Sequence, residues 1–130
     1  MIEIVIAAHG DLARGFGEAI ELILGPQEQM AYLNLEPEMG PSELMEKMAA
    51  AIASVDSGEG VLICVDLFGG TPCNVALALT AETNSVCLTG INLGMLLEAV
   101  TLRGSGEGPI SIANKLVETG KGGIQQVKIC

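Results

Sequence analysis

The alternation of apolar runs with amphipathic segments is the feature that most constrains the fold of this chain. The short apolar runs predict strands over Ile2–Ala7, Met30–Leu35, Val61–Val65, Ser85–Thr89 and Ile124–Ile129. Apolar residues at helical spacing predict helices over Leu12–Leu24, Thr71–Ala81, Leu93–Thr101 and Ile110–Glu118, and a further helix that opens at Gly40-Pro41-Ser42. Such alternation with short connections is typical of a doubly wound α/β domain, in which helices cover both faces of a mostly parallel sheet.

Local signals mark several helix ends. We expect Asp11 to cap the first helix and Thr71 to cap the third, with proline in its first turn. The apolar face of the second helix is formed by Leu44, Met48, Ile52 and Val55.

The last strand, Ile124–Ile129, alternates apolar and polar residues after a glycine pair, which suits an edge strand, antiparallel or paired with another subunit. Residues 1–130 read as a single domain.

Composition excludes several functions. The formal net charge is −10, and residues 1–60 hold eleven acidic residues against Arg14 and Lys47. Such a surface repels nucleic acid and anionic membranes, and it favours a basic protein partner as well as solubility. No apolar run reaches the ~20 residues of a membrane-spanning helix, and the N-terminus lacks the features of a signal peptide. We therefore expect a cytoplasmic protein without direct membrane insertion.

The chain has four cysteines, Cys64, Cys73, Cys87 and Cys130. They show no CxxC spacing, and three of the four lie in apolar stretches. Buried, reduced thiols in the cytosol are the simplest interpretation, in preference to disulfides or a zinc site. Neither a GxGxxG sequence after the first strand nor a P-loop is present. We expect no metal and no cofactor.

Three unusual segments follow predicted strands of the sheet. His9-Gly10 follows the first strand, Asp66 to Asn74 follows the third, and Gly90 to Gly94 follows the fourth. Ligands of an open parallel sheet bind outside the carboxyl ends of its strands. The prediction is therefore one crevice that collects a histidine, a carboxylate, a Gly-Gly-Thr turn and an asparagine.

His9 is the only histidine of the chain, and Gly10 beside it leaves room for a ligand or another backbone segment. Imidazole acts as a nucleophile or as an acid–base group near neutral pH. A histidine nucleophile needs its second nitrogen held by a partner, and Asp66 is suitably placed, although a simple capping role for Asp66 is the alternative.

The Gly69-Gly70-Thr71-Pro72 segment opens a helix whose free N–H groups and positive dipole end attract anions. The glycines let a phosphate approach, and the Thr71 hydroxyl can donate to it. A merely capped helix start is the alternative. Asn92 is expected mainly to cap the next helix, with a contact in the crevice as the lesser alternative.

These segments together resemble the IIA domains of the mannose-type sugar phosphotransferase system (PTS). The motif AHG followed by Leu12-Ala13-Arg14-Gly15 is similar to the start of that family. Asp66-Leu67-Phe68-Gly69-Gly70-Thr71-Pro72-Cys73-Asn74 resembles its second motif, and the segment Gly90 to Glu98 resembles a third. Cys73 stands where the family commonly has Phe, and Gly94 where it commonly has Pro.

The resemblance implies that His9 accepts a phosphoryl group from the phosphocarrier protein HPr and passes it to a IIB component. The IIB component would phosphorylate a sugar entering through the membrane IIC/IID permease. Asp66 would orient His9, and Gly70 and Thr71 would line the phosphate position. The resemblance also implies a homodimer formed by exchange of the C-terminal strand.

Several other functions are alternatives to a phosphoryl relay at His9. The phosphotransfer subunit of a dihydroxyacetone kinase system would use the same histidine with another acceptor, and a non-catalytic anion-binding α/β module would use the crevice alone. A receiver domain would be phosphorylated at Asp66, but it needs an acidic pair after the first strand. This chain lacks that pair. A redox or hydrolase role for Cys73 is disfavoured, because its only available base is His9.

Overall fold

The structure, a computed structural model, describes residues 1–55 and 57–129. The side chain of Val55 and Cys130, for which we made predictions above, lie outside this described part. The described residues form four strands, β1 (Glu3–His9), β2 (Met30–Leu35), β3 (Val61–Val65) and β4 (Ser85–Leu88). They also form five helices, α1 (Leu12–Leu24), α2 (Pro41–Val55), α3 (Thr71–Thr80), α4 (Leu93–Leu102) and α5 (Pro109–Gly122).

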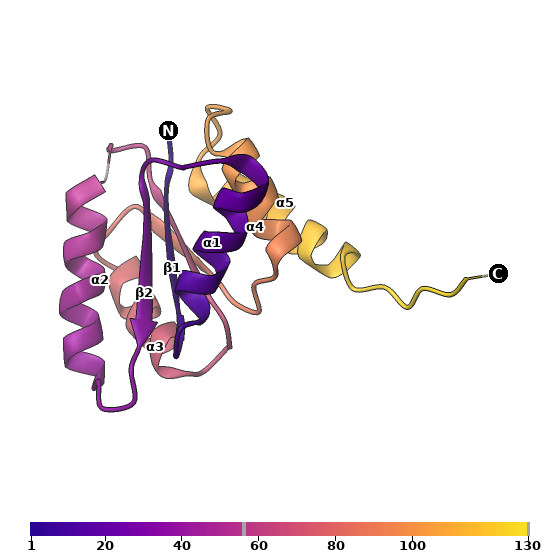
Figure 1. Cartoon of the computed structure of the whole chain (residues 1–130). Coiled ribbons are helices and arrows are strands. Elements are labelled where there is room, and N and C mark those ends of the chain that lie inside the picture. The colour runs from indigo at the N-terminus through magenta and orange to yellow at the C-terminus, as the bar shows by residue number, and fades with distance from the viewer. Residues whose placement is uncertain (56, 130) are drawn as a thin grey trace.

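The strands form one parallel sheet in the order β2-β1-β3-β4 (Figure 1). In the register of β1 with β2, His9 lies opposite Leu35, and in the register with β3, Ala7 lies opposite Val65. The carboxyl ends of the three neighbouring strands therefore reach the same edge of the sheet. The predicted doubly wound α/β fold is confirmed.

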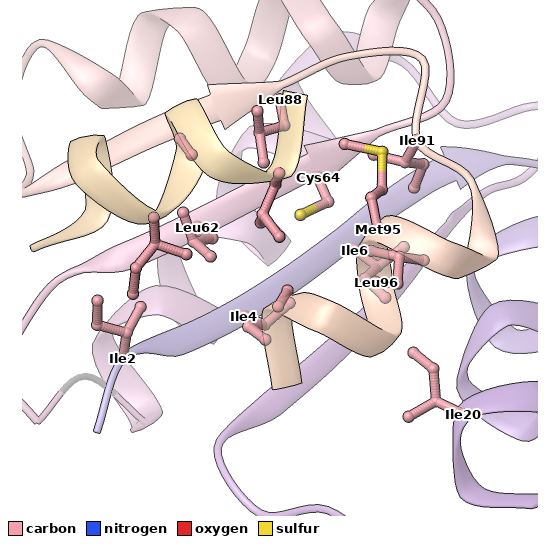
Figure 2. Packing of buried hydrophobic residues seen from close by; sticks show 14 of the residues in the cluster. Ile2, Ile4, Ile6, Ile20, Leu62, Cys64, Leu88, Ile91, Met95 and Leu96 are labelled. Carbon is pink, nitrogen blue, oxygen red and sulfur yellow. The ribbon is translucent and has the colours of Figure 1, made fainter. Parts of the chain in front are cut away.

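Helices cover both faces of the sheet because alternate side chains of each strand point to opposite sides. One apolar cluster joins Ile2, just before β1, and Ile4 and Ile6 of β1 to α1, α4 and α5 (Figure 2). The other joins Val5 and Ala7 to α2 and α3. Both faces of β1 and β3 are therefore buried, which explains why their sequences are nearly continuous apolar runs.

The C-terminal region differs from the prediction. Helix α5 continues to Gly122, beyond the predicted end at Glu118. Residues 124–129 form no strand and pair with no strand of the described chain, and Ile129 is 99% exposed. In Figure 1 this segment extends away from the body of the molecule. A strand needs a neighbour to bond its backbone, and the single chain offers none beside it.

The described helices include none that is both long and apolar enough to cross a bilayer. Cys64 and Cys73 are buried free thiols, and Cys87 is half-buried and also free. Burial raises the pKa of the Cys64 thiol to about 12, and burial with the neighbouring Cys73 does the same for Cys87. Both thiols are protonated at neutral pH and are poor nucleophiles.

Candidate functional site

The structure brings His9 and Asp66 together at the carboxyl edge of the sheet. His9 is the last residue of β1, and Asp66 directly follows β3. The Nδ1 atom of His9 lies 2.8 Å from Oδ2 of Asp66. The histidine side chain is 45% exposed, whereas that of Asp66 is only 11% exposed. The crevice therefore holds a reachable imidazole against a largely buried carboxylate.

Asp66 is fixed by three hydrogen bonds. Its Oδ2 also accepts from the backbone N–H of His9 at 3.0 Å, and its Oδ1 accepts from the backbone N–H of Leu67 at 3.0 Å. Burial acts to raise the pKa of the Asp66 carboxyl, but the backbone and side-chain hydrogen bonds from His9, the charge of His9 and a hydrogen bond from the backbone of Asp66 itself outweigh it. The pKa of Asp66 consequently lies below its ordinary value, so the carboxylate is ionised at neutral pH.

This ionised carboxylate determines which ring nitrogen of His9 is free. A carboxylate only accepts hydrogen bonds, so Nδ1 of His9 must carry the proton that it donates to Asp66. In the neutral ring Nε2 then holds a lone pair. Within residues 1–55 and 57–129, Nε2 has no hydrogen-bond partner. The site thus presents an oriented ring nitrogen whose lone pair can act as a nucleophile.

The turn before α3 lies against the imidazole. Gly69 has a φ of +84°, which favours glycine, and a Cβ added to Gly70 would lie 2.9 Å from Cε1 and 3.5 Å from Nε2 of His9. The amide of Asn74 ties this turn by donating to the carbonyl of Gly69 at 3.4 Å. Only a residue without a side chain lets the backbone come this close to the ring.

The predicted capping role of Thr71 is wrong. Thr71 is the first residue of α3, and Gly70 takes the cap position without any side-chain hydrogen bond in the described structure. The first N–H groups of a helix lack partners within the helix, and Pro72 has no N–H. The N–H groups of Thr71 and Cys73 and the Thr71 hydroxyl therefore take part in no capping hydrogen bond at the start of α3 in the described structure. They follow directly on Gly70, which lies against the His9 ring.

Gly10 and Asn92 have local structural roles. Gly10 has a φ of +59°, and its N–H donates to the carbonyl of Leu35 at 2.9 Å, turning the chain away from β1. Asn92 caps α4 by accepting from the N–H of Met95 at 3.1 Å, as expected. Its amide nitrogen donates to the carbonyl of Gly120 at 3.0 Å. Both ends of the Asn92 amide are thus engaged.

The remaining polar contacts of this edge were missed by sequence reasoning. The predicted capping role of Asp11 is wrong: Asp11 stands at the cap position of α1, but its side chain makes no cap hydrogen bond in the described chain. Asn34 of β2 instead accepts from the backbone N–H of Arg14 at 3.2 Å. An asparagine within a strand carries no signal for such a role. No group of three or more His, Cys, Asp or Glu residues in the described ranges has a geometry that could hold a metal ion.

The fold and this histidine–aspartate pair are accompanied by clear sequence relationships. The family profile described as PTS system fructose IIA component matches residues 3–115. The chain therefore belongs to this family of PTS IIA components.

Individual relatives agree with the family assignment. The mannose-specific EIIAB component of Escherichia coli is 32% identical over 98% of this chain, and the fructose-specific EIIA component of Bacillus subtilis is 34% identical over 79%. The match covers 71% of the Bacillus subtilis protein, but the chain spans only 40% of the length of the Escherichia coli relative.

Solved structures match over nearly the whole chain. The EIIA component from Streptococcus agalactiae superposes with a TM-score of 0.91 at 33% identity, over 97% of both chains. The mannose/sorbose-specific IIA subunit from Enterococcus faecalis gives 0.90 at 25% identity, over 99% of this chain and 96% of its own. Both confirm the fold.

Proposed function

We propose that this protein is a phosphoryl-relay component in which Nε2 of His9 accepts a phosphoryl group from phospho-HPr and passes it to a IIB component. The observation that carries the proposal is the 2.8 Å contact between Nδ1 of His9 and Oδ2 of Asp66, which leaves Nε2 as the nucleophile. Membership of the PTS IIA family supports the direction of the relay.

In the transfer step the lone pair of Nε2 attacks phosphorus. The bond between phosphorus and its carrier atom on HPr breaks, and that atom keeps the electron pair. The His9 ring then carries the phosphoryl group on Nε2 and a proton on Nδ1, so it is positively charged. The ionised Asp66 stabilises this cation through the hydrogen bond that already orients the ring. The same step in reverse, with IIB as the attacking partner, regenerates neutral His9.

The start of α3 would hold the phosphoryl oxygens. Gly70 lies against the His9 ring, so the backbone of the Gly69-Gly70 turn is close to the phosphoryl position. The N–H of Thr71, its hydroxyl and the positive end of the helix dipole favour the negative charge that accumulates there.

The surface around His9 has the properties of a protein-docking site. Leu67 is 58% exposed and Phe68 is 82% exposed, and both follow Asp66 directly. A hollow of about 510 Å³ follows the end of β2 and is lined by Glu36, Pro37, Glu38, Met39, Glu43 and Lys47. Exposed apolar side chains after Asp66 and a mainly acidic hollow after β2 suit a partner that presents both apolar and basic groups. We assign HPr and IIB to this surface.

The relatives favour a sugar system over a dihydroxyacetone kinase or a non-catalytic anion-binding module, because their names describe PTS components specific for mannose, fructose and sorbose. The relay would operate in the cytoplasm, where HPr and a IIB component coupled to a membrane IIC/IID permease would meet it.

A homodimer is part of the proposal. The segment 124–129 projects from the body of the chain with Ile124, Val127 and Ile129 each more than 80% exposed. Strand β4 has an unpaired edge in the described sheet. An exchanged antiparallel strand would cover the apolar residues of the segment and pair its backbone. Size-exclusion chromatography with light scattering tests the dimer separately from the chemistry.

The relay is tested by incubating the protein with enzyme I, HPr and phosphoenolpyruvate, followed by intact-mass measurement. We expect one phosphoryl group on the wild type, labile to acid and stable to base, and none on His9→Ala. Cys73→Ser serves as the control and should be labelled like the wild type. Failure of a folded wild-type protein to accept phosphate would refute the proposal.

A further inference from the structure

The chain between His9 and α1 is attached to β2 on the side opposite to Asp66. Strand β1 lies between β2 and β3, so Asp66 contacts His9 from the β3 side. From the β2 side, the carbonyl of Leu35 accepts from the N–H of Gly10 at 2.9 Å. The turn that follows His9 is thus held by β2, independently of the hydrogen bond between His9 and Asp66.

Asn34 takes the place of the cap residue of α1. Arg14 is the third residue of α1, and its N–H is one of those that a cap side chain normally satisfies. Here the acceptor is Oδ1 of Asn34, 3.2 Å away, from the neighbouring strand. Asp11 occupies the cap position with φ −92° and ψ 13°, a backbone geometry that is not extended, and its carboxylate makes no cap bond in the described structure.

The other end of the Asn34 amide holds the Asp11 carboxylate. Nδ2 of Asn34 donates to Oδ1 of Asp11 at 3.4 Å, which draws this carboxylate toward β2. Asp11 is two residues from His9, and a carboxylate near an incoming phosphoryl group would repel it. The Asn34 amide therefore fixes the start of α1 and also holds the negatively charged Asp11 carboxylate on the β2 side.

We propose that Asn34 is a positioning residue for phosphoryl transfer, acting through the His9–Arg14 segment and through the placement of the Asp11 carboxylate. This inference rests on the proposed relay at His9. It differs from a purely stabilising role, because it predicts that the transfer step itself depends on positions 11 and 34 holding one amide and one carboxylate.

Single-turnover transfer from phospho-HPr separates these roles when the maximal rate and the half-saturating concentration are measured together with thermal unfolding. Asn34→Ala removes both contacts, and we expect the maximal rate to fall on the order of tenfold. Asn34→Asp keeps an acceptor for the Arg14 N–H but sets a second carboxylate against Asp11. We expect this variant to be slow as well.

The decisive variant is the exchange, Asp11→Asn combined with Asn34→Asp. It restores an amide–carboxylate pair while keeping an acceptor for Arg14, so the maximal rate should return to within about threefold of the wild type. Asn114→Asp makes the same chemical change at an exposed position on α5 and is the matched control, with an unchanged rate expected.

Two results would overturn the inference. A shift in only the unfolding temperature of Asn34→Ala, with no change in the transfer rate, would show a structural role alone. An exchange variant no faster than Asn34→Asp would exclude the pairing. If the wild type accepts no phosphoryl group in the same assay, the relay fails and this inference fails with it, whereas equal rates for wild type and all variants refute only the role of Asn34.

Discussion

The two ends of the sheet use polar side chains in opposite ways. At the amino end, Arg103 is 3% exposed and donates to the carbonyl of Gln29 at 3.2 Å and to Oε1 of Gln27 at 3.1 Å. At the carboxyl end, His9 is 45% exposed and has one nitrogen held by Asp66. Arg103 is a buried tie between α4 and the segment before β2, whereas His9 is fixed on one side and left open on the other.

The difference teaches how a reactive group is recognised in a small domain. A polar group that only stabilises the fold is buried with its bonding capacity directed to the protein, because an unmet buried donor costs free energy. A reactive group is oriented by part of its bonding capacity and keeps the rest accessible. Substitutions at the carboxyl end should therefore change transfer, and those at the amino end should change stability.

The largest effect is expected for Gly70→Ala. The added Cβ would lie 2.9 Å from Cε1 of His9, closer than packed carbon atoms approach, so the ring or the turn must move. We expect transfer from phospho-HPr to fall on the order of 100-fold while the thermal unfolding temperature changes little. Gly122→Ala, where an added Cβ meets no atom within 4 Å, is the matched control. Equal rates for the two variants would contradict the assigned contact.

A smaller effect, on stability alone, is expected for Arg103→Met. It preserves much of the apolar stem but removes the donors to Gln27 and Gln29, and we expect a loss of about 1–3 kcal/mol in the free energy of unfolding. Urea denaturation measures the loss, and the transfer rate below the unfolding transition should stay within about twofold of the wild type. A large loss of transfer in the folded variant would break the comparison.

The smallest effect concerns acid stability at Asp66. Because the pKa of Asp66 is lower in the folded chain than in the unfolded one, its ionised form stabilises the fold above its ordinary pKa. That contribution is lost as the pH falls from the ordinary pKa through the lower folded pKa. Asp66→Asn should therefore show a weaker decline of stability in this acidic range than the wild type. Parallel declines, measured by urea denaturation at several pH values, would argue against it.

The order of elements was predictable because burial determines it. Strands β1 and β3 are covered on both faces, so their sequences could not be read as surface segments. Once the strands are parallel, their carboxyl ends must share an edge, and the proximity of His9 and Asp66 follows from the topology. The contact between His9 and Asp66 could therefore be predicted, because the alternation of strands and helices in the sequence determines the order of the parallel sheet.

Finer features depended on choices that the sequence leaves open. The cap position of α3 is Gly70 and not the predicted Thr71. Both residue types are common at helix caps, so the sequence could not distinguish the two neighbouring positions. Asn34 reaches Arg14 and Asp11, 20 and 23 residues away along the chain, and no local pattern announces such a pair. The 124–129 segment has the alternation of a strand but no neighbouring strand in the single chain.

The single uncommitted nitrogen of His9 has a kinetic consequence for the proposed relay. Since Nδ1 is engaged by Asp66, phosphorus must arrive at and depart from the same atom, on the same exposed side of the ring. Donor and acceptor proteins must then take turns, and each competes with the other for the docking surface. Flux through the protein would pass through a maximum as either partner is increased, and the relay would be self-limiting when one partner is in large excess.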